Sequence, residues 1–344
     1  MGGGWGSPKK NLIPDEVTFK SKPEIAIEQI DRLLKNGIRV MAWNADEAYG
    51  RDGFFLDALD ARHQAFVCEA PGTFTVWLKY PKVGRKSEKR DYRRIKRLRE
   101  SDEKPTRIRD VVVTSPTFKH QSPQRYIVRI SNKGEEVWEI RWAICWRKTH
   151  TMKMVSNPCT LVVARNVLTN ETKFFISNRV PGSNGWSLRK TLKVAFSRWP
   201  VEDCFREAKE ELGLDHFECR SWKCIHRHYF VTLLGHLFCA HTRKKLSKTE
   251  DVTSDEYLTV EQVRRAVNAN LGATTDPPRV RASKYKAEYD IQSYYQKRNA
   301  YAIKSHRKKR RAAFKALGIN LHTTKSIYDT KKRRSKPRKL ALSN

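Results

Sequence analysis

The residues best suited to chemistry lie in one short charged segment, from Arg198 to Gly213. Within it, Glu202, Arg206 and Lys209 recur at steps of four and three residues, so on a helix they share one face. Glu202 falls in the first turn, where the helix dipole favours an ionised carboxylate. A carboxylate beside cations suits a site that binds a divalent metal together with a phosphate. A solvated helix face with ordinary ion pairs is the alternative.

Asp46 is a second candidate ligand, because it follows the apolar run Ile38–Asn44, which predicts a strand inside a sheet. Ligands of open α/β sheets gather at the carboxyl ends of strands. In-line displacement at phosphorus needs metal ions held by carboxylates from separate elements. An aspartate in this position can instead cap a helix or begin a turn, and that alternative stays open.

The elements around Glu202 must hold it in place. Pro200 suits the first helical position and Gly213 suits a left-handed exit, so the sequence predicts a helix between them. The apolar residues of this segment recur at three- and four-residue steps and are predicted to form its buried face: Val201, Cys204, Phe205, Ala208 and Leu212.

Composition points to a polyanionic partner. The 344 residues carry 70 Lys and Arg against 37 Asp and Glu, a net charge of +33. Such an excess favours nucleic acid, with ribosome-type assemblies and membrane surfaces as alternatives. No stretch approaches eighteen apolar residues, and the first ten residues lack the apolar core of a signal peptide. We therefore expect a cytoplasmic, nucleoid-associated protein without a membrane partner.

The seven cysteines are odd in number and scattered, which predicts reduced thiols. Cys219 and Cys224 lie close to His226 and His228, but there is no C-x-x-C pair, so ordinary packed or solvated side chains are favoured over a zinc site. We expect the histidines of this region to be packed or solvated rather than catalytic.

Hydrophobic periodicity predicts an α/β beginning. Helices are expected at 23–36 and 53–62, and strands at 38–44 and 64–69, which is the alternation of an α/β sheet. A small antiparallel β module inserted into the α/β domain is expected next, with strands at Val111–Thr114, Arg125–Ser131, Val137–Arg147, Thr160–Asn166 and Lys173–Ser177. Helices are expected from Leu188 through the Glu202 segment, at Cys224–Leu246 and at Val260–Leu271. In the helix at Cys224–Leu246, four apolar residues are expected to form the core face: Leu233, Leu234, Leu237 and Phe238.

Two segments concentrate the basic charge. Residues 81–110 carry 13 Lys and Arg against 6 acids, a net of +7, and are interpreted as a basic linker or DNA-facing loop. Residues 281–344 carry 20 Lys and Arg against 3 acids, a net of +17, and the following tyrosines are interleaved with these charges: Tyr285, Tyr289, Tyr294, Tyr295 and Tyr301. Its last part, 331–339, is predicted to be a solvated arm that contacts phosphates.

The spacing Arg198, three residues, Glu202, six residues, Lys209 resembles the signature around the catalytic glutamate of bacterial insertion-sequence DDE transposases, in the subgroup with a Tyr-Arg-Glu-Lys motif. Asp46 trailed by Tyr49-Gly50 is similar to that family's second catalytic aspartate. The run from Glu211 to Trp222 also looks like the family. In one position the chain departs from the motif, because Ala195 fills the tyrosine slot.

The resemblance implies an RNase H-like α/β core interrupted by an antiparallel β insertion. It implies catalysis and Mg²⁺ or Mn²⁺ binding by Asp46 and Glu202, with DNA phosphates contacted by Arg198, Arg206 and Lys209. The implied partners are terminal inverted repeats and target DNA, bound by a homodimer on paired ends. The corresponding segments are a partial core at 1–80, a linker and β insertion at 81–185, the remaining core at 186–246 and a basic, partly disordered tail at 247–344.

The family's first aspartate lies on a strand upstream of the helix expected at 23–36. Asp15 and Asp31 do not match its motif. We therefore expect an N-terminally truncated or mis-started transposase whose activity alone is uncertain, since it lacks one metal ligand. The alternative is a non-catalytic, basic DNA-binding remnant of a transposase.

Overall fold

The computed structural model describes residues 12–87, 94–98, 104–150, 154–249, 259–272 and 276–328. It divides into two compact units. The larger comprises residues 20–198 and 307–344, and the smaller comprises residues 1–19 and 199–306. Each unit has a hydrophobic cluster of its own.

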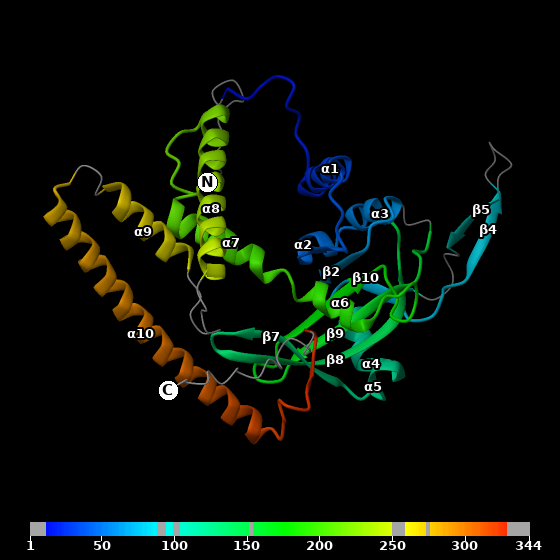
Figure 1. The fold of residues 1–344 in the computed structure, drawn as a ribbon. Coiled ribbons are helices and arrows are strands. Elements are labelled where there is room, and N and C mark those ends of the chain that lie inside the picture. Colours follow the sequence, from blue (N-terminus) through cyan, green and yellow to red (C-terminus); the bar gives the residue numbers. More distant parts are fainter. Residues whose placement is uncertain are drawn as a thin grey trace, which may run out of the picture. The chain divides into compact units, whose positions relative to one another are not determined.

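The larger unit is built on a nine-stranded mixed sheet (Figure 1). Its strands run in the order β1-β2-β10-β9-β8-β3-β6, and β7 pairs with both β8 and β11. Their bounds are β1 Trp43–Ala45, β2 Phe66–Ala70, β3 Thr75–Trp77, β6 Thr106–Arg107, β7 Gln124–Ser131, β8 Gly134–Arg147, β9 Cys159–Asn166, β10 Thr172–Ser177 and β11 Lys325–Ser326. A separate hairpin pairs β4 (Val83–Ser87) with β5 (Arg94–Leu98), within the predicted basic linker, part of which lies outside the described residues.

Strands β7 to β10 are antiparallel and lie where alternation predicts them. β10 pairs antiparallel with β2, with Ile176 opposite Cys68, so these strands belong to the same sheet as β1 and β2. The pairing of β10 with β2 was not predicted, because the choice of partner strand depends on contacts that are distant in sequence. That these strands are an insertion into the α/β domain stays a prediction.

Helices cover both faces of this sheet. One face packs against α1 (Lys22–Lys35), α3 (Gly53–Ala61), α4 (Ile108–Thr114) and α5 (Pro116–Lys119). The other packs against α6 (Leu188–Ala195). Alternate residues of β9 supply the two cores, Leu161 and Val163 to the first and Val162 and Ala164 to the second, as the pleat requires.

Residues Val111–Thr114 are helical, so the strand predicted there is wrong. The β-branched run suggested a strand, but Ile108 and Val111 lie three residues apart and both are buried against the first core, whereas Val113 is exposed. Burial at helical spacing outweighs a preference of the order of 1 kcal/mol for the strand.

Strand β1 differs from its prediction in length and place. The expected strand Ile38–Asn44 is reduced to Trp43–Ala45, and Ile38, Val40 and Met41 are exposed. Among the described strands β1 lies at the edge of the sheet and pairs in parallel with β2. A continuous apolar run predicted a central strand, yet only one side of this segment has a partner in the part of the chain that the structure describes.

The smaller unit contains α7 (Trp199–Leu212), α8 (Trp222–Thr249), α9 (Val260–Gly272) and the first part of the 39-residue helix α10 (Pro278–Ala316). Cys239 of α8 packs with Val260 and Val263 of α9. The predicted core face of α8 is wrong, because its four residues are 47–63% exposed: Leu233, Leu234, Leu237 and Phe238. Helices α7 and α9 pack against α8, and its Thr232 and Cys239 are buried, whereas its leucine-rich side is exposed.

Residues beyond 306 return to the larger unit. Phe314 and Ile319 are buried against the β7–β8 hairpin, and β11 pairs in parallel with β7. Ile327 is buried in the second core. The segment expected to be a basic tail therefore contains a helix, a short strand and part of a core, whereas the predicted arm at 331–339 lies outside the described residues.

Candidate functional site

Asp46 stands at the carboxyl end of β1, where the sequence places it. It is the N-cap of the single-turn helix α2 (Glu47–Gly50), and its Oδ1 accepts hydrogen bonds from the backbone N–H groups of Ala48 at 3.0 Å and Tyr49 at 3.4 Å. The alternative of a helix cap is thus realised. Within the described residues nothing donates to its second oxygen, Oδ2, so Asp46 retains one oxygen for a ligand.

Gly50 fixes the position of α2 on the sheet. It is buried, and a Cβ atom built there would lie 1.8 Å from the carbonyl oxygen of Glu69 on β2. Only glycine permits this approach. The glycine of the Tyr49-Gly50 pair that follows Asp46 therefore has a structural reason, namely close contact between the capped turn and the neighbouring strand.

Asn44 attaches the end of α6 to β1. Its side-chain amide donates to the backbone carbonyl groups of Val194 and Ala195, the last two residues of α6. This contact joins the strand that carries Asp46 to the segment that leads into α7. Sequence reasoning missed Asn44, since nothing in its local pattern indicates a partner 150 residues away.

Helix α7 begins at Trp199, one residue before the predicted first position at Pro200, and ends at Leu212 as predicted. Gly213 has a φ of +69°, and the N–H of Leu214 bonds to the carbonyl of Ala208, which closes the helix as expected. The predicted buried stripe is largely wrong, however. Ala208 is fully buried and Leu212 is half-buried, but Val201 and Phe205 are more than half exposed and Cys204 is exposed.

The charged face of α7 carries both signs. Glu202 lies in the first turn and is exposed, and Lys209 is exposed one turn before the C-terminus. Arg206 forms ion pairs with Asp203 at 3.1 Å and Glu210 at 3.2 Å, and the hydrogen bond to Asp203 is the main reason that its pKa is raised. These pairs are solvent-exposed and therefore weak, so a phosphate can displace them.

The predicted site residues divide between the two units. Asp46 and Arg198 belong to the larger unit, and Glu202, Arg206 and Lys209 belong to the smaller. The convergence of the Asp46 and Glu202 carboxylates therefore stays a prediction.

A disulfide joins Cys219, in the loop between α7 and α8, to Cys224 in the first turn of α8, so the prediction of reduced thiols is wrong for these two residues. Their close spacing in the sequence had suggested only a disfavoured zinc site. Free cysteines remain at five positions, and Cys204 is the exposed one among them. Burial raises the pKa of Cys68 to about 12, so this thiol next to β1 stays protonated.

Histidines of α8 hold the helices of the smaller unit together. The Nε2 atom of His228 lies 2.9 Å from the carbonyl oxygen of Gly213 at the end of α7, and His236 lies between Glu207 and the sulfur of Cys204. His236 Nε2 is 3.4 Å from the Glu207 carboxylate. These packed contacts account for both rings.

Arg147 forms a buried ion network in the larger unit. It is 1% exposed and donates to Asp57 at 2.6 Å and Asp60 at 2.7 Å, both on α3. The second oxygen of Asp57 accepts from the backbone N–H of His150, and that of Asp60 accepts from Asn178. Each carboxylate oxygen thus has a partner, so the network is structural rather than a metal site.

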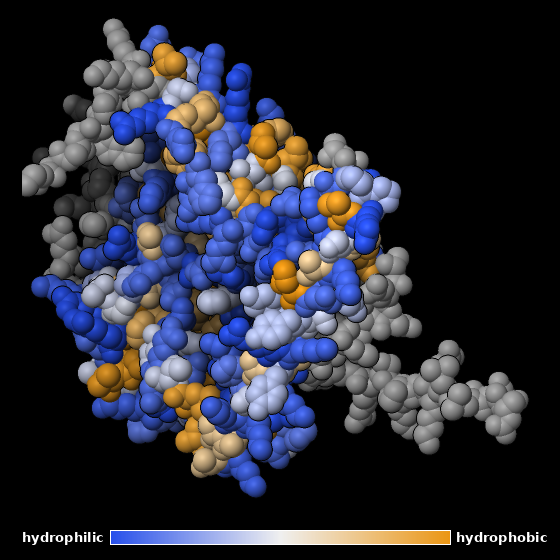
Figure 2. All heavy atoms as spheres, turned by 90° about the vertical axis from the view of Figure 1, so that its left-hand side faces the viewer, coloured by the Kyte–Doolittle hydropathy of each residue, from blue (hydrophilic) through white to orange (hydrophobic). Residues whose placement is uncertain are grey.

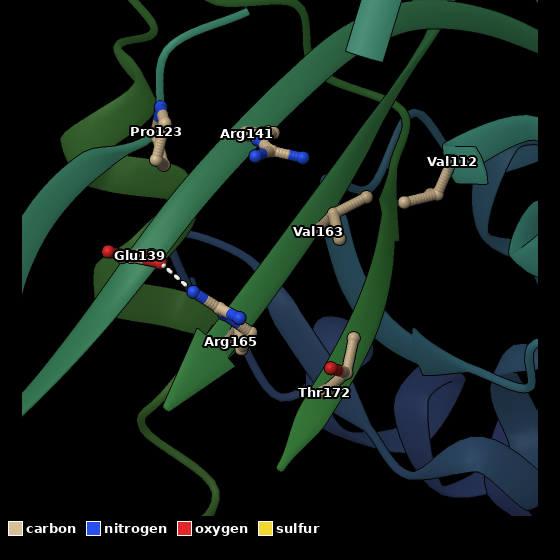
Figure 3. Close-up of a pocket in the computed structure, with 7 residues that line it drawn as sticks. All are labelled: Val112, Pro123, Glu139, Arg141, Val163, Arg165 and Thr172. Atoms are coloured by element: carbon tan, nitrogen blue, oxygen red, sulfur yellow. Dashed lines mark hydrogen bonds and ion pairs between the residues drawn. The ribbon is translucent and has the colours of Figure 1, made fainter. Parts of the chain in front are cut away.

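A small cavity of about 180 Å³ opens on the sheet between β8, β9, β10 and α4 (Figure 3). Val112 and Val163 point toward each other across it, and Arg165 reaches Glu139 at 2.7 Å. Burial alone would raise the pKa of Glu139, but hydrogen bonds from Arg165 and Arg125 outweigh it and lower the pKa. The charge of Glu139 is therefore already neutralised by ion pairs with Arg125 and Arg165.

No group of three or more His, Cys, Asp or Glu side chains that could hold a metal ion occurs within the described residues. Asp46, with one oxygen uncommitted, fits the role of a single carboxylate ligand. None of the described helices combines the length and the apolar character needed to cross a membrane.

Comparison with protein families gives a match for the N-terminal part of the chain. Residues 7–132 are similar to the family described as DDE superfamily endonuclease, a segment of little more than a third of the chain that contains Asp46 but not α7. No curated protein matches the chain. Within this segment, the match and the mixed α/β sheet support a DDE-type, transposase-like nuclease, a class that acts on DNA and generally uses divalent metal ions.

Proposed function

We propose that this protein is a DDE transposase that cuts and joins the ends of an insertion sequence with Mg²⁺ or Mn²⁺. The observation that carries the proposal is the position of Asp46 at the carboxyl end of a parallel strand, inside the segment that matches the DDE endonucleases. Bound metal would activate the attacking oxygen and stabilise the leaving one. Asp46 and Glu202 are assigned as two of its carboxylate ligands.

The Asn44 contact supports this pairing. It holds Ala195 at β1, and Glu202 is only seven residues further along the chain. Four extended residues span at most about 14 Å, and three helical steps add about 5 Å. The covalent chain therefore keeps Glu202 within roughly 20 Å of Ala195. A site that contains both carboxylates is compatible with this limit, although 155 residues separate them in sequence.

The cations near Glu202 are assigned to DNA phosphates. Arg198 precedes α7, and Arg206 and Lys209 share the Glu202 face by helical spacing. Guanidinium and ammonium groups neutralise phosphates without reading sequence, which suits the positioning of a strand near the cut.

The test is metal-dependent cleavage of DNA that carries the terminal repeats taken from the sequence flanking the gene. Asp46→Asn and Glu202→Gln should each lower the rate by about two orders of magnitude or more while DNA binding persists. Glu47→Gln and Glu210→Gln, neighbours on α2 and α7, serve as matched controls with little effect. Unchanged cleavage by Asp46→Asn or Glu202→Gln would exclude the assignment.

A non-catalytic DNA-binding protein is the second candidate, and the cap formed by Asp46 favours it, because a capping role alone accounts for that residue. Under this reading the wild-type chain binds DNA but gives no metal-dependent cleavage on any end sequence, and Asp46→Asn lowers stability only.

A further inference from the structure

A second, larger cavity in the larger unit has a composition that the assigned site does not explain. Its volume is about 340 Å³. It is lined by the α2–α3 junction, by the turn that follows β2 and by the end of β8: Arg51, Gly53, Pro71, Thr73, Phe74, Thr75, Arg147, Lys148, Thr149 and His150. The lining contains three basic side chains and a histidine, three threonines and no carboxylate.

The basic residues of this cavity differ in how they are neutralised. Arg147 is buried and already paired with Asp57 and Asp60. Arg51 and Lys148 are exposed, and no ion pair or hydrogen bond joins either side chain to another described residue. Two cations that have no ion pair with another described residue therefore line this cavity, and the carboxylates of Asp57 and Asp60 behind it are already bonded to Arg147.

The walls are held in place by backbone contacts. The N–H of Arg51 bonds to the carbonyl of Glu47, and the N–H of His150 bonds to Asp57. Lys148 forms an isolated antiparallel bridge with Val155. Helix α3 begins at Gly53 in the wall, and its N-terminal dipole adds positive potential. The cations are thus presented by ordered backbone.

The cavity is close to Asp46. Asp46 caps the start of α2, and Arg51 is the C-cap of the same single turn. Five helical residues correspond to about 8 Å along the axis. A nucleic-acid strand rises about 3.4 Å per nucleotide, so this length corresponds to two or three nucleotides.

We propose that Arg51 and Lys148 bind a backbone phosphate of the DNA strand, two or three nucleotides from the phosphate at Asp46. The identification of the anion as DNA rests on the proposed function, but binding at this pocket does not require cleavage. A free phosphate or nucleotide has the same chemistry, and the experiment separates these sources.

The experiment measures the affinity of the full chain for a fluorescent DNA duplex by anisotropy, with EDTA present and at several salt concentrations. Arg51→Gln/Lys148→Gln should weaken binding about tenfold and reduce the slope of log K against log salt by about 1, since each neutralised phosphate contributes about 0.9. Lys119→Gln/Lys133→Gln removes the same charge from exposed residues elsewhere on the unit and should weaken binding less than twofold. Arg51→Lys/Lys148→Arg, which keeps both charges, should bind like wild type.

Equal losses in the two neutralised variants, or wild-type affinity in the pocket variant, would overturn the proposal. Competition with inorganic phosphate distinguishes a pocket for DNA from a pocket for free phosphate. At 10 mM, inorganic phosphate should displace DNA no more than chloride of equal ionic strength does. If phosphate displaces DNA more than chloride from the wild-type chain, but not from Arg51→Gln/Lys148→Gln, the pocket binds free phosphate instead. Failure of the proposed function shows separately, as unchanged cleavage by Asp46→Asn, and leaves this binding result intact.

Discussion

Gly50 shows how one missing side chain positions the candidate ligand. Its Cα faces the Glu69 carbonyl so closely that any Cβ must push α2 away from β2. Gly50→Ala should therefore lower the free energy of unfolding of the larger unit by about 3 kcal/mol. Urea unfolding measures the loss. Gly53→Ala is the control, because its new Cβ would meet no atom closer than 3.4 Å.

Glu139 makes stability depend on pH. Its pKa in the folded protein is below the ordinary value of 4.5, because hydrogen bonds from Arg165 and Arg125 outweigh its burial. Its contribution is therefore fully present above about pH 4.5 and is lost as the pH falls through the folded pKa. Glu139→Gln should flatten the dependence of unfolding free energy on pH below pH 4.5. An unchanged slope in that range would contradict this account.

At the scale of elements, the α7–α8 loop depends on its disulfide. A bridge between Cys219 and Cys224 closes a loop of six residues, which in the chain-entropy account corresponds to about 2 kcal/mol. Reductant should lower the urea midpoint of the smaller unit in the wild-type chain and leave Cys219→Ser/Cys224→Ser unaffected. Cys204→Ser, which removes the exposed free thiol, should keep the full sensitivity to reductant.

The exposed apolar residues of α7 and α8 mark the limit of periodicity as a guide to burial. Phe205 and Leu237 sit at helical spacing within apolar stripes, yet both are more than half exposed. A stripe indicates which face a helix can bury, but the partner that covers it comes from elsewhere in the fold. Within the smaller unit, Ala208 and Thr232 are buried instead.

At the scale of the whole molecule, the C-terminal region carries much of the positive charge and also contributes buried residues to the hydrophobic cores. Most residues on the face in Figure 2 are hydrophilic, and on α10 Tyr289, Tyr294 and Tyr301 are 63–79% exposed. The same region supplies Phe314, and beyond α10 Ile327, to the cores of the larger unit. Removal of residues 281–344 would therefore expose these cores as well as removing positive charge.

A shorter deletion separates the two roles. Residues 331–344 contain seven Lys and Arg and no acid, and the described buried contacts end before them. Their removal should leave the unfolding midpoint unchanged and reduce the salt slope of DNA binding by up to about 6, at 0.9 per phosphate contact. Removal of 281–344 should instead unfold the larger unit, as seen by circular dichroism. An unchanged salt slope after the shorter deletion would exclude the arm as a phosphate contact.

The sequence by itself determined the local elements and their ends. Gly213 ends α7, and alternation located β7 to β10, because left-handed glycines and period-two patterns act within a few residues. The acidic candidates Asp46 and Glu202 were found in the same way, from their places beside a strand and in a helix turn.

Only the tertiary structure decided which elements meet. It joined β10 to β2, made Val111–Thr114 helical, left the leucine face of α8 exposed, and brought Arg51 and Lys148 to one cavity from segments almost 100 residues apart. Each outcome depends on contacts between distant segments, whose free energies are comparable to local propensities and leave no periodic trace in the sequence.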